Sequence, residues 1–158
     1  MNLGATALLL AVDIVVVAGA SILVGALAPR WPARWLQRDV GPLILLPFET
    51  PAWYRRIGAP RLARHLPELG DTFGGQSKSA LPGGRREHLA AYLVEVRRAE
   101  WVHWASIAVT LLLFLWNPWW LAMVFVVVVA GGNAPFIAVL RNNRVRLRRI
   151  IDKDGSSA

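Results

Sequence analysis

A dense group of ionisable residues stands immediately before a long apolar stretch of the chain. From Glu95 to Trp104 the sequence holds two acids, two arginines and a histidine, and no charged residue then follows until Arg141. Ionisable groups at the mouth of a membrane-spanning helix are costly to desolvate and usually serve a function. The segment therefore predicts a reaction site at a membrane surface and favours an enzyme that acts on lipids.

The spacing within this segment places Glu100 and His103 on one helix face. Residues three apart are neighbours on a helix, and a carboxylate beside an imidazole orients the ring and raises its basicity. We therefore expect His103 to act as a general base toward a hydroxyl, oriented by Glu100. Arg97 extends the same stripe, and Arg98 is placed to pair with Glu95. Alternatively, these charges form interfacial ion pairs that only anchor the helix.

Three apolar stretches are candidates to span a bilayer, at about residues 3–28, 101–116 and 119–140. A hydrocarbon core of about 30 Å needs roughly 20 helical residues, so the second stretch is short unless it extends backward through the run from Glu87. Two aromatic belts flank the last two stretches, formed by Trp101, Trp104, Trp116, Trp119 and Trp120. The sequence predicts an all-α membrane protein of one domain, residues 1–158, with three transmembrane helices and a long C-terminal helical hairpin extending into the cytoplasm.

The distribution of charge predicts the orientation. The 158-residue chain has net charge +8 and mean hydropathy +0.41, and all 18 lysines and arginines lie within residues 30–98 and 141–153. Three spans put both segments on one side, which the positive-inside rule makes the cytoplasm. We expect a multi-pass cell-membrane protein with its N terminus outside and residues 29–100 and 141–158 cytoplasmic. A signal peptide cleaved after Ala28 is the alternative, but the basic n-region that it needs is missing.

The segment between the first two spans divides into short pieces. Tryptophan and arginine recur at near-helical spacing over 30–38, which predicts a helix lying among the lipid headgroups. The proline-bracketed apolar run at 42–48 predicts a re-entrant or interfacial patch. Short helices are expected at 52–56 and 60–65, separated by a glycine, and a loop rich in Gly, Ser and Pro at 71–84.

A tight antiparallel turn at residues 117–118 would place residues whose numbers sum to about 235 at equal depth. His103 would then lie level with Asn133. The surrounding segment 131–135 predicts a kink, because its proline removes a backbone hydrogen bond and its glycines let another helix approach. We therefore expect the charged motif and this break to form one site, in which Asn133 stabilises a developing oxyanion.

A basic cluster follows the third span and comprises Arg141, Arg144, Arg146, Arg148 and Arg149. Such clusters bind anionic lipid headgroups. Arg141, Asn143 and Arg144 lie nearest the expected site, where they could hold a phosphate such as that of coenzyme A. Asp13, a lone acid in the first span, is expected to bond a water or a polar group on a neighbouring helix.

Several chemistries are excluded or disfavoured. The chain has no cysteine, which rules out disulfides, thiol nucleophiles and thiolate metal sites. Its three histidines lack metal-ligand spacing, and no G-x-S-x-G nucleophile elbow occurs. The run Gly74–Lys78 lacks the full spacing of a phosphate loop. Nucleic-acid binding is not expected, because membrane orientation already accounts for the positive charge.

The charged segment resembles a motif of the glycosyl-4,4'-diaponeurosporenoate acyltransferase family, small membrane proteins of the staphyloxanthin-type carotenoid pathway. The family pattern E-x-[KR]-R-A-E-x-x-H-W is matched by Glu95, Arg97, Arg98, Ala99, Glu100, His103 and Trp104. A following N-x-P is matched by Asn133 and Pro135. A third pattern, Q-R-Y-N-R-x-R, is matched by Arg141, Asn143, Arg144 and Arg146, with Leu140 and Asn142 in place of Gln and Tyr.

The resemblance implies transfer of a fatty acyl group to a sugar hydroxyl of a glycosylated carotenoid or another lipid glycoside. Acyl-CoA would be the donor substrate, with no bound cofactor or metal. Membrane lipids and the lipid glycoside would be the partners, and a homo-oligomer is compatible with three spans. The expected catalytic residues are His103, Glu100 and Asn133. The expected substrate-binding residues are Arg97, Arg98, Glu95, Trp104, Arg141, Asn143 and Arg144.

The alternative function is a non-catalytic one, either a lipid-binding subunit or an assembly subunit of a membrane enzyme complex. In that case the charged motif would serve as an ion-pair lock between two helices. A transporter is less consistent with the sequence, because three spans would have to oligomerise to enclose a path.

Overall fold

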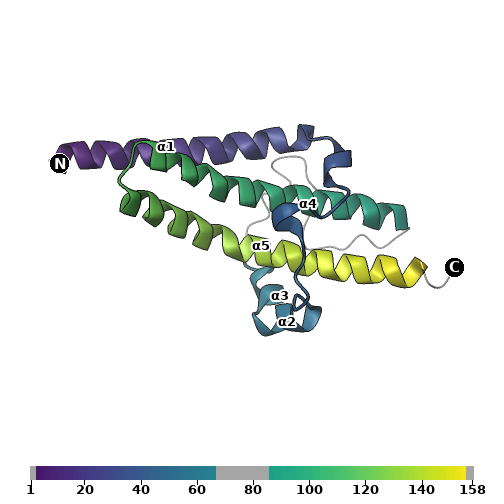
Figure 1. The fold of residues 1–158 in the computed structure, drawn as a ribbon. Helices are drawn as coiled ribbons and strands as arrows, with labels where there is room; N and C mark the ends of the chain where they lie inside the picture. Colours follow the sequence, from purple (N-terminus) through teal and green to yellow (C-terminus); the bar gives the residue numbers. More distant parts are fainter. Residues whose placement is uncertain (1–2, 67–85, 156–158) are drawn as a thin grey trace.

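The computed structural model describes residues 3–66 and 86–155, and within these ranges it consists of helices and their connections. Three long helices lie side by side in Figure 1: α1 (Leu3–Leu27), α4 (Arg86–Val109) and α5 (Trp119–Gly155). All three are long and apolar enough to cross a membrane. The predicted all-α fold with three such helices is confirmed. The loop expected at 71–84, including Gly74–Lys78, lies outside the described residues.

Helix α1 is apolar on nearly its whole surface, which suits a hydrocarbon environment. Its largest exposed side chains are aliphatic: Leu8, Val12, Ile14, Val15, Ile22 and Leu23. Only a narrow stripe packs on the rest of the protein, where Val17 forms a small cluster with Leu113 and Ala122. The helix thus needs lipid around it to cover its exposed faces.

Helices α4 and α5 form the predicted antiparallel hairpin. On α4 the residues at spacings of three and four pack against α5, in a core made of Leu89, Tyr92, Leu93, Val96, Leu140 and Leu147. Because α4 begins at Arg86, the expected backward extension of the second span is confirmed. The two helices therefore remain packed well beyond the purely apolar stretch.

The far end of α4 changes to a 3-10 helix, Thr110–Leu115, before the turn into α5. The hydroxyl of Thr110 donates to the carbonyl of Ile107 at 2.6 Å, as serine and threonine do in tightened or bent helices. A 3-10 helix rises about 2.0 Å per residue, against about 1.5 Å in an α-helix. This tighter winding lengthens the short second span.

The segment 131–135, where the sequence predicts a kink, does not interrupt the third span. Helix α5 continues through Pro135 as a single element of 37 residues. A proline removes only one backbone donor, and the helical bonds on either side hold the helix together. The glycines do not admit a neighbouring helix either, since a Cβ at Gly131 or Gly132 would meet no atom within 4 Å.

The segment after α1 folds into three short 3-10 turns, Ala28–Arg30, Ala33–Leu36 and Gly41–Leu43. The single headgroup helix predicted at 30–38 is therefore wrong. The reason lies in Pro32, which disfavours the α-conformation of the residue before it. Trp31 accordingly adopts an extended conformation, with ψ 129°.

Two short helices follow, α2 (Pro51–Arg56) and α3 (Ala59–Leu62), which confirms the expected pair. The Thr50 hydroxyl caps α2 by accepting from the Trp53 amide at 3.2 Å. Between the helices Gly58 adopts φ +79°, a conformation that favours glycine. Both helices contact α5, on the side opposite α1 (Figure 1).

Asp13 attaches α1 to the hairpin turn. Its side chain is fully buried, and its Oδ1 accepts from Trp116 Nε1 and from Asn117 Nδ2, both at 2.9 Å. The prediction of a polar partner on a neighbouring element is confirmed. Because Asp13 lies ten residues into α1, the start of this helix extends past the turn (Figure 1).

Replacing Asp13 with leucine should therefore loosen α1 from the hairpin. The change leaves the buried donor of Asn117 and the partly buried donor of Trp116 without an acceptor, which costs about 1–3 kcal/mol. Asp13→Asn retains an acceptor oxygen and should lose less than half as much. Unfolding by denaturing detergent, followed by tryptophan fluorescence, measures both variants. An Asp13→Leu protein as stable as the wild type would show that this attachment contributes nothing.

Candidate active site

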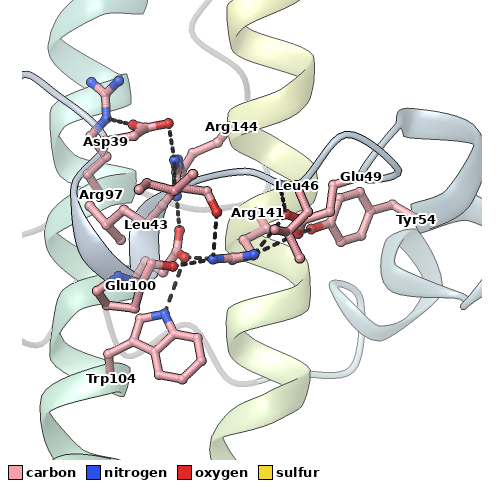
Figure 2. Close-up of polar contacts among 12 residues, drawn as sticks. Asp39, Leu43, Leu46, Glu49, Tyr54, Arg97, Glu100, Trp104, Arg141 and Arg144 are labelled. Carbon is pink, nitrogen blue, oxygen red and sulfur yellow. Dashed lines mark hydrogen bonds and ion pairs between the residues drawn. The ribbon is translucent and has the colours of Figure 1, made fainter.

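A continuous series of buried ion pairs joins α4, α5 and the segment that precedes α2 (Figure 2). We refer to it as the ion-pair chain, and its members, in order of contact, are Arg97, Asp39, Arg144, Glu100, Arg141 and Glu49. Positive and negative groups alternate along it. Such alternation is required because an uncompensated charge buried near hydrocarbon is far more costly than a paired one.

One end of the ion-pair chain is organised by Asp39. Its Oδ1 lies 2.7 Å from Arg97 Nε on α4, and its Oδ2 lies 2.5 Å from Arg144 Nη2 on α5. Arg148, one turn further along α5, also places Nη2 2.5 Å from Oδ2. A single carboxylate in the connecting segment therefore holds three guanidinium groups from two helices.

The centre of the ion-pair chain is Glu100, which is fully buried. Its Oε1 accepts from Arg141 Nε at 2.8 Å, and its Oε2 accepts from Arg144 Nη1. The indole of Trp104 adds a longer contact to Oε1 at 3.4 Å. Side chains lean toward the N terminus of their helix, so in an antiparallel pair those of Glu100 and Arg141 lean toward each other.

The other end of the ion-pair chain is Glu49, which accepts from Arg141 Nη1 at 2.8 and 2.9 Å. The Tyr54 hydroxyl and, at 2.5 Å, the Leu46 amide also donate to this carboxylate. Burial alone would raise the pKa of Glu49, but the hydrogen bonds from Leu46, Tyr54 and Arg141 outweigh it and lower the pKa below 4.5. Burial and the adjacent Glu49 carboxylate together raise the pKa of Tyr54.

The two central arginines also hold the backbone of the apolar patch predicted at 42–48. Arg141 Nη2 donates to the carbonyl of Pro42, and Arg144 Nη2 donates to that of Leu43 at 2.5 Å. Leu43 is fully buried beneath this crossing. We call residues 39–49 the strap, because this segment lies across α4 and α5 and is fastened to both (Figure 2).

His103 lies about one helical turn from Glu100 along α4 and has a different set of neighbours. Its Nδ1 is 2.7 Å from Asn133 Oδ1, so the predicted hairpin register is confirmed at this depth. The imidazole also stacks on Phe136, with ring centroids 4.9 Å apart and planes at 19°. Asn133 Nδ2 donates to the Val129 carbonyl at 2.8 Å.

These contacts determine which nitrogen of His103 carries the proton. The Val129 carbonyl can only accept, so the NH₂ group of Asn133 must face it and the amide oxygen must face the imidazole. His103 Nδ1 is then the donor, and in the neutral ring Nε2 carries the lone pair. The geometry thus provides a base nitrogen together with an amide that fixes its tautomer.

Several predicted residues take different partners from those expected. Glu100 binds Arg141 and Arg144, and the residue that orients the His103 ring is Asn133. Arg97, Arg141 and Arg144, expected to hold donor phosphates, are instead engaged by carboxylates within the protein.

One predicted ion pair is confirmed. Arg98 pairs with Glu95 as expected and also reaches the Trp31 carbonyl at 3.4 Å. Trp104 lies beside the ion-pair chain, and Asn143 is buried on α5. No group of three or more His, Cys, Asp or Glu in the described residues is arranged to hold a metal ion.

The sequence analysis missed three residues of the site: Asp39, Glu49 and Tyr54. A signal was present, since Asp39 and Glu49 are the only acids between Asp13 and Glu68, within a segment of many arginines. Two isolated acids beside a basic helix pair indicate ion-pair partners. Which arginines they pair with depends on the path of the strap, which the sequence does not specify.

The fold and site define a small helical membrane protein. Its polar site lies where the apolar parts of the helices end and their charged parts, covered by the strap, begin. The glycosyl-4,4'-diaponeurosporenoate acyltransferase (CrtO) family model matches residues 32–153. The chain belongs to this family, and it is an acyltransferase of carotenoid biosynthesis. The match extends over the strap as well as the hairpin. No curated protein and no solved structure matches the chain.

Glu100→Gln should unfold the site, because it leaves two buried guanidinium groups with too little negative charge. Breaking a buried ion pair by removing one partner costs about 3–5 kcal/mol. Glu95→Gln, a matched change on the same helix, disrupts a more exposed pair and should cost less than about 1 kcal/mol. Detergent unfolding of the two variants tests this difference. Equal stabilities would contradict the central structural role of Glu100.

The stability of the protein should fall on acidification partly through Glu49. Because its folded pKa lies below the unfolded value of 4.5, its contribution to the free energy of unfolding is complete above that value. The contribution is lost as the pH falls through the lowered folded pKa. Unfolding measured from pH 7 down to pH 3 should show a smaller acid-induced loss in Glu49→Gln than in the wild type. Parallel curves would refute the assignment.

Proposed function

We propose that the protein transfers a fatty acyl group from acyl-CoA to a sugar hydroxyl of a glycosylated carotenoid or a related lipid glycoside. The observation that carries the proposal is the His103–Asn133 pair, in which the amide fixes the tautomer of the neutral imidazole between two apolar helices. The family supports the reaction class. The identities of the acyl donor and of the acceptor hydroxyl go beyond the family match and are part of our proposal.

In the proposed reaction, His103 Nε2 takes the proton of the acceptor hydroxyl as its oxygen attacks the thioester carbon. The carbon–sulfur bond then breaks, the thiolate of coenzyme A leaves, and the imidazolium returns the proton to it. The products are an ester and free coenzyme A. His103 is the catalytic residue in this scheme, and Asn133 and Phe136 are positioning residues.

The neighbours of His103 suit the charged state that it must pass through. The Asn133 oxygen accepts from Nδ1, and the face of the Phe136 ring lies against the imidazole, where it favours a positive charge. A neutral amide in this position orients the ring as the asparagine of Cys-His-Asn proteases does. We therefore assign Asn133 to orientation instead of the oxyanion role that the sequence suggested.

The exposed face beside Asn133 suits the acyl chain of the donor. Gly131 and Gly132 are exposed, and among the described residues no neighbouring atom lies within 4 Å of a Cβ placed at either. An acyl chain in the bilayer can therefore approach the helix backbone near His103.

We place the site on the cytoplasmic side, where acyl-CoA is available, with the N terminus outside. The support is the confinement of all 18 Lys and Arg residues to the two segments that lie on one side of three spans.

The competing, non-catalytic function assumes that the charged motif is an ion-pair lock between helices. That lock exists, but it is formed by Glu100 with Arg141 and Arg144 and leaves the His103–Asn133 pair for chemistry.

His103→Ala should lower the rate of acyl transfer by about 10²–10⁴-fold without loss of fold, because it removes the base. The assay incubates protein in nanodiscs with labelled long-chain acyl-CoA and a lipid extract of the host, and follows label into lipid by mass spectrometry. His88→Ala, which removes an exposed histidine of the same helix, is the matched control. Full activity of a folded His103→Ala protein would refute the mechanism.

The positioning role of Asn133 is tested by the dependence of kcat/KM on pH. In Asn133→Asp a carboxylate faces the imidazole and stabilises its protonated form. The acidic limb of the profile of kcat/KM against pH should therefore move to higher pH. An unchanged profile would mean that Asn133 does not orient the base.

A further inference from the structure

The ion-pair chain leaves the proposed donor without an obvious site for its phosphates. The side chains of Arg97 and Arg144 are more than nine-tenths buried, and that of Arg141 is 13% exposed. All three are paired with carboxylates. A phosphate could bind them only by displacing those carboxylates. The anionic end of the donor must therefore be bound elsewhere if the proposed function is correct.

A shallow surface cavity of about 480 Å³, widely open to solvent, lies between the strap and the C-terminal part of α5. Its lining comprises Leu45, Glu49, Val145, Arg148, Arg149, Asp152 and Lys153. The residues from α5 recur at intervals of three and four, so they form one helix face opposite the strap. The cavity is thus defined by two elements that the ion-pair chain holds together.

The charge of this cavity is positive. Three cations and two acids line it, Asp152 and a Glu49 that is already paired with Arg141 and hydrogen-bonded to Tyr54, which leaves a net charge of +1. Arg148 is anchored by Asp39 but keeps 40% of its side chain exposed. Leu45 and Val145 add an apolar surface. Guanidinium groups beside an apolar wall suit a phosphate that is attached to a larger organic group.

We propose that this cavity binds the phosphate-bearing end of the acyl donor, an inference that rests on the proposed function. The ligand chemistry is a phosphate ester or diphosphate, which a phospholipid headgroup or coenzyme A could supply. Position along α5 favours coenzyme A. Arg148 and Lys153 lie seven and twelve residues beyond Arg141, or about 10 and 18 Å by helical rise. The headgroup layer is only about 5–8 Å thick, so the cations at the outer end of the cavity lie beyond it.

The position also suits a donor that spans from the cavity to His103. Asn133 and Arg149 are sixteen residues apart on one continuous helix, or about 24 Å. The long flexible arm between the diphosphate and the thioester of acyl-CoA would follow α5 toward the imidazole. The strap would then hold the donor at one end, while the acyl chain enters the apolar region beside Gly131 at the other.

The test measures binding of unacylated coenzyme A to the full-length protein in nanodiscs of neutral phosphatidylcholine. A double variant, Arg149→Gln with Lys153→Gln, removes two cavity cations that are not part of the ion-pair chain. It should weaken binding about tenfold or more, as expected for loss of charge-assisted contacts to phosphate. Arg55→Gln with Arg56→Gln removes the same charge from the exposed surface of α2 and should change Kd less than about twofold.

A second arm repeats the measurement in nanodiscs that contain anionic phospholipid. Binding of coenzyme A that persists there, with the same dependence on Arg149 and Lys153, supports the proposal. Competition by the anionic lipid would overturn it in favour of a headgroup site. Equal weakening in both double variants would also overturn it, because it would reduce the effect to net charge.

The two proposals fail in different ways. His103→Ala should still bind coenzyme A with unchanged affinity, since the cavity lies far from His103. Binding without any transfer by the wild type would leave the cavity assignment intact and refute the reaction. Transfer whose KM for acyl-CoA is unaffected by the Arg149 and Lys153 changes would refute the cavity assignment alone.

Discussion

The need to pair every charge that is buried at the edge of an apolar helix hairpin governs this structure. A carboxylate or guanidinium group in such a place is tolerated only when partners surround it. The protein meets the requirement with alternating charges drawn from three elements, and Glu100 lies at the centre with no exposed surface. Two of its partners also bind backbone carbonyls of the strap, so the electrostatic network fixes the path of the connecting segment as well. The remaining features of the site depend on this fastening.

The residues of the charged motif belong to two separate groups, the ion-pair chain and the His103–Asn133 pair. Glu100 and His103 are three residues apart, yet one belongs to a rigid lock and the other faces a neutral amide and an aromatic ring. This separation suits the proposed base His103, because a carboxylate that is already paired with two arginines cannot also stabilise an imidazole whose charge changes during the reaction. It also reconciles the two functions that the sequence left open, since a lock between helices and the proposed catalytic group occupy successive turns of one helix.

The apolar parts of the molecule are arranged around this polar layer. One cluster, which includes Leu89 and Leu147, holds the hairpin on the charged side, and a second, around Val17 and Leu113, holds α1 to the turn. Asp13 strengthens the second contact through Trp116 and Asn117. The helices are thus fixed at both ends of the apolar region, while the side of α5 that carries Gly131 and Gly132 is left open. Such an open side near His103 suits the acyl chain of the proposed reaction.

The sequence by itself determined the helical class, the three apolar helices, the hairpin turn and its register, because apolar length and tryptophan placement are local properties. It also identified the charged motif and the acyltransferase family. The tertiary structure alone decided which charges pair, since that depends on the strap, whose course is set by prolines and by arginine contacts with Pro42 and Leu43. Helical spacing correctly placed Glu100 and His103 near each other, but Arg141 and Arg144 approach Glu100 from another helix and satisfy both of its oxygens. Glu100 pairs with the arginines of the other helix because a buried carboxylate needs an opposite charge more than a neutral imidazole needs one. No local pattern in the sequence shows which residues will supply that charge.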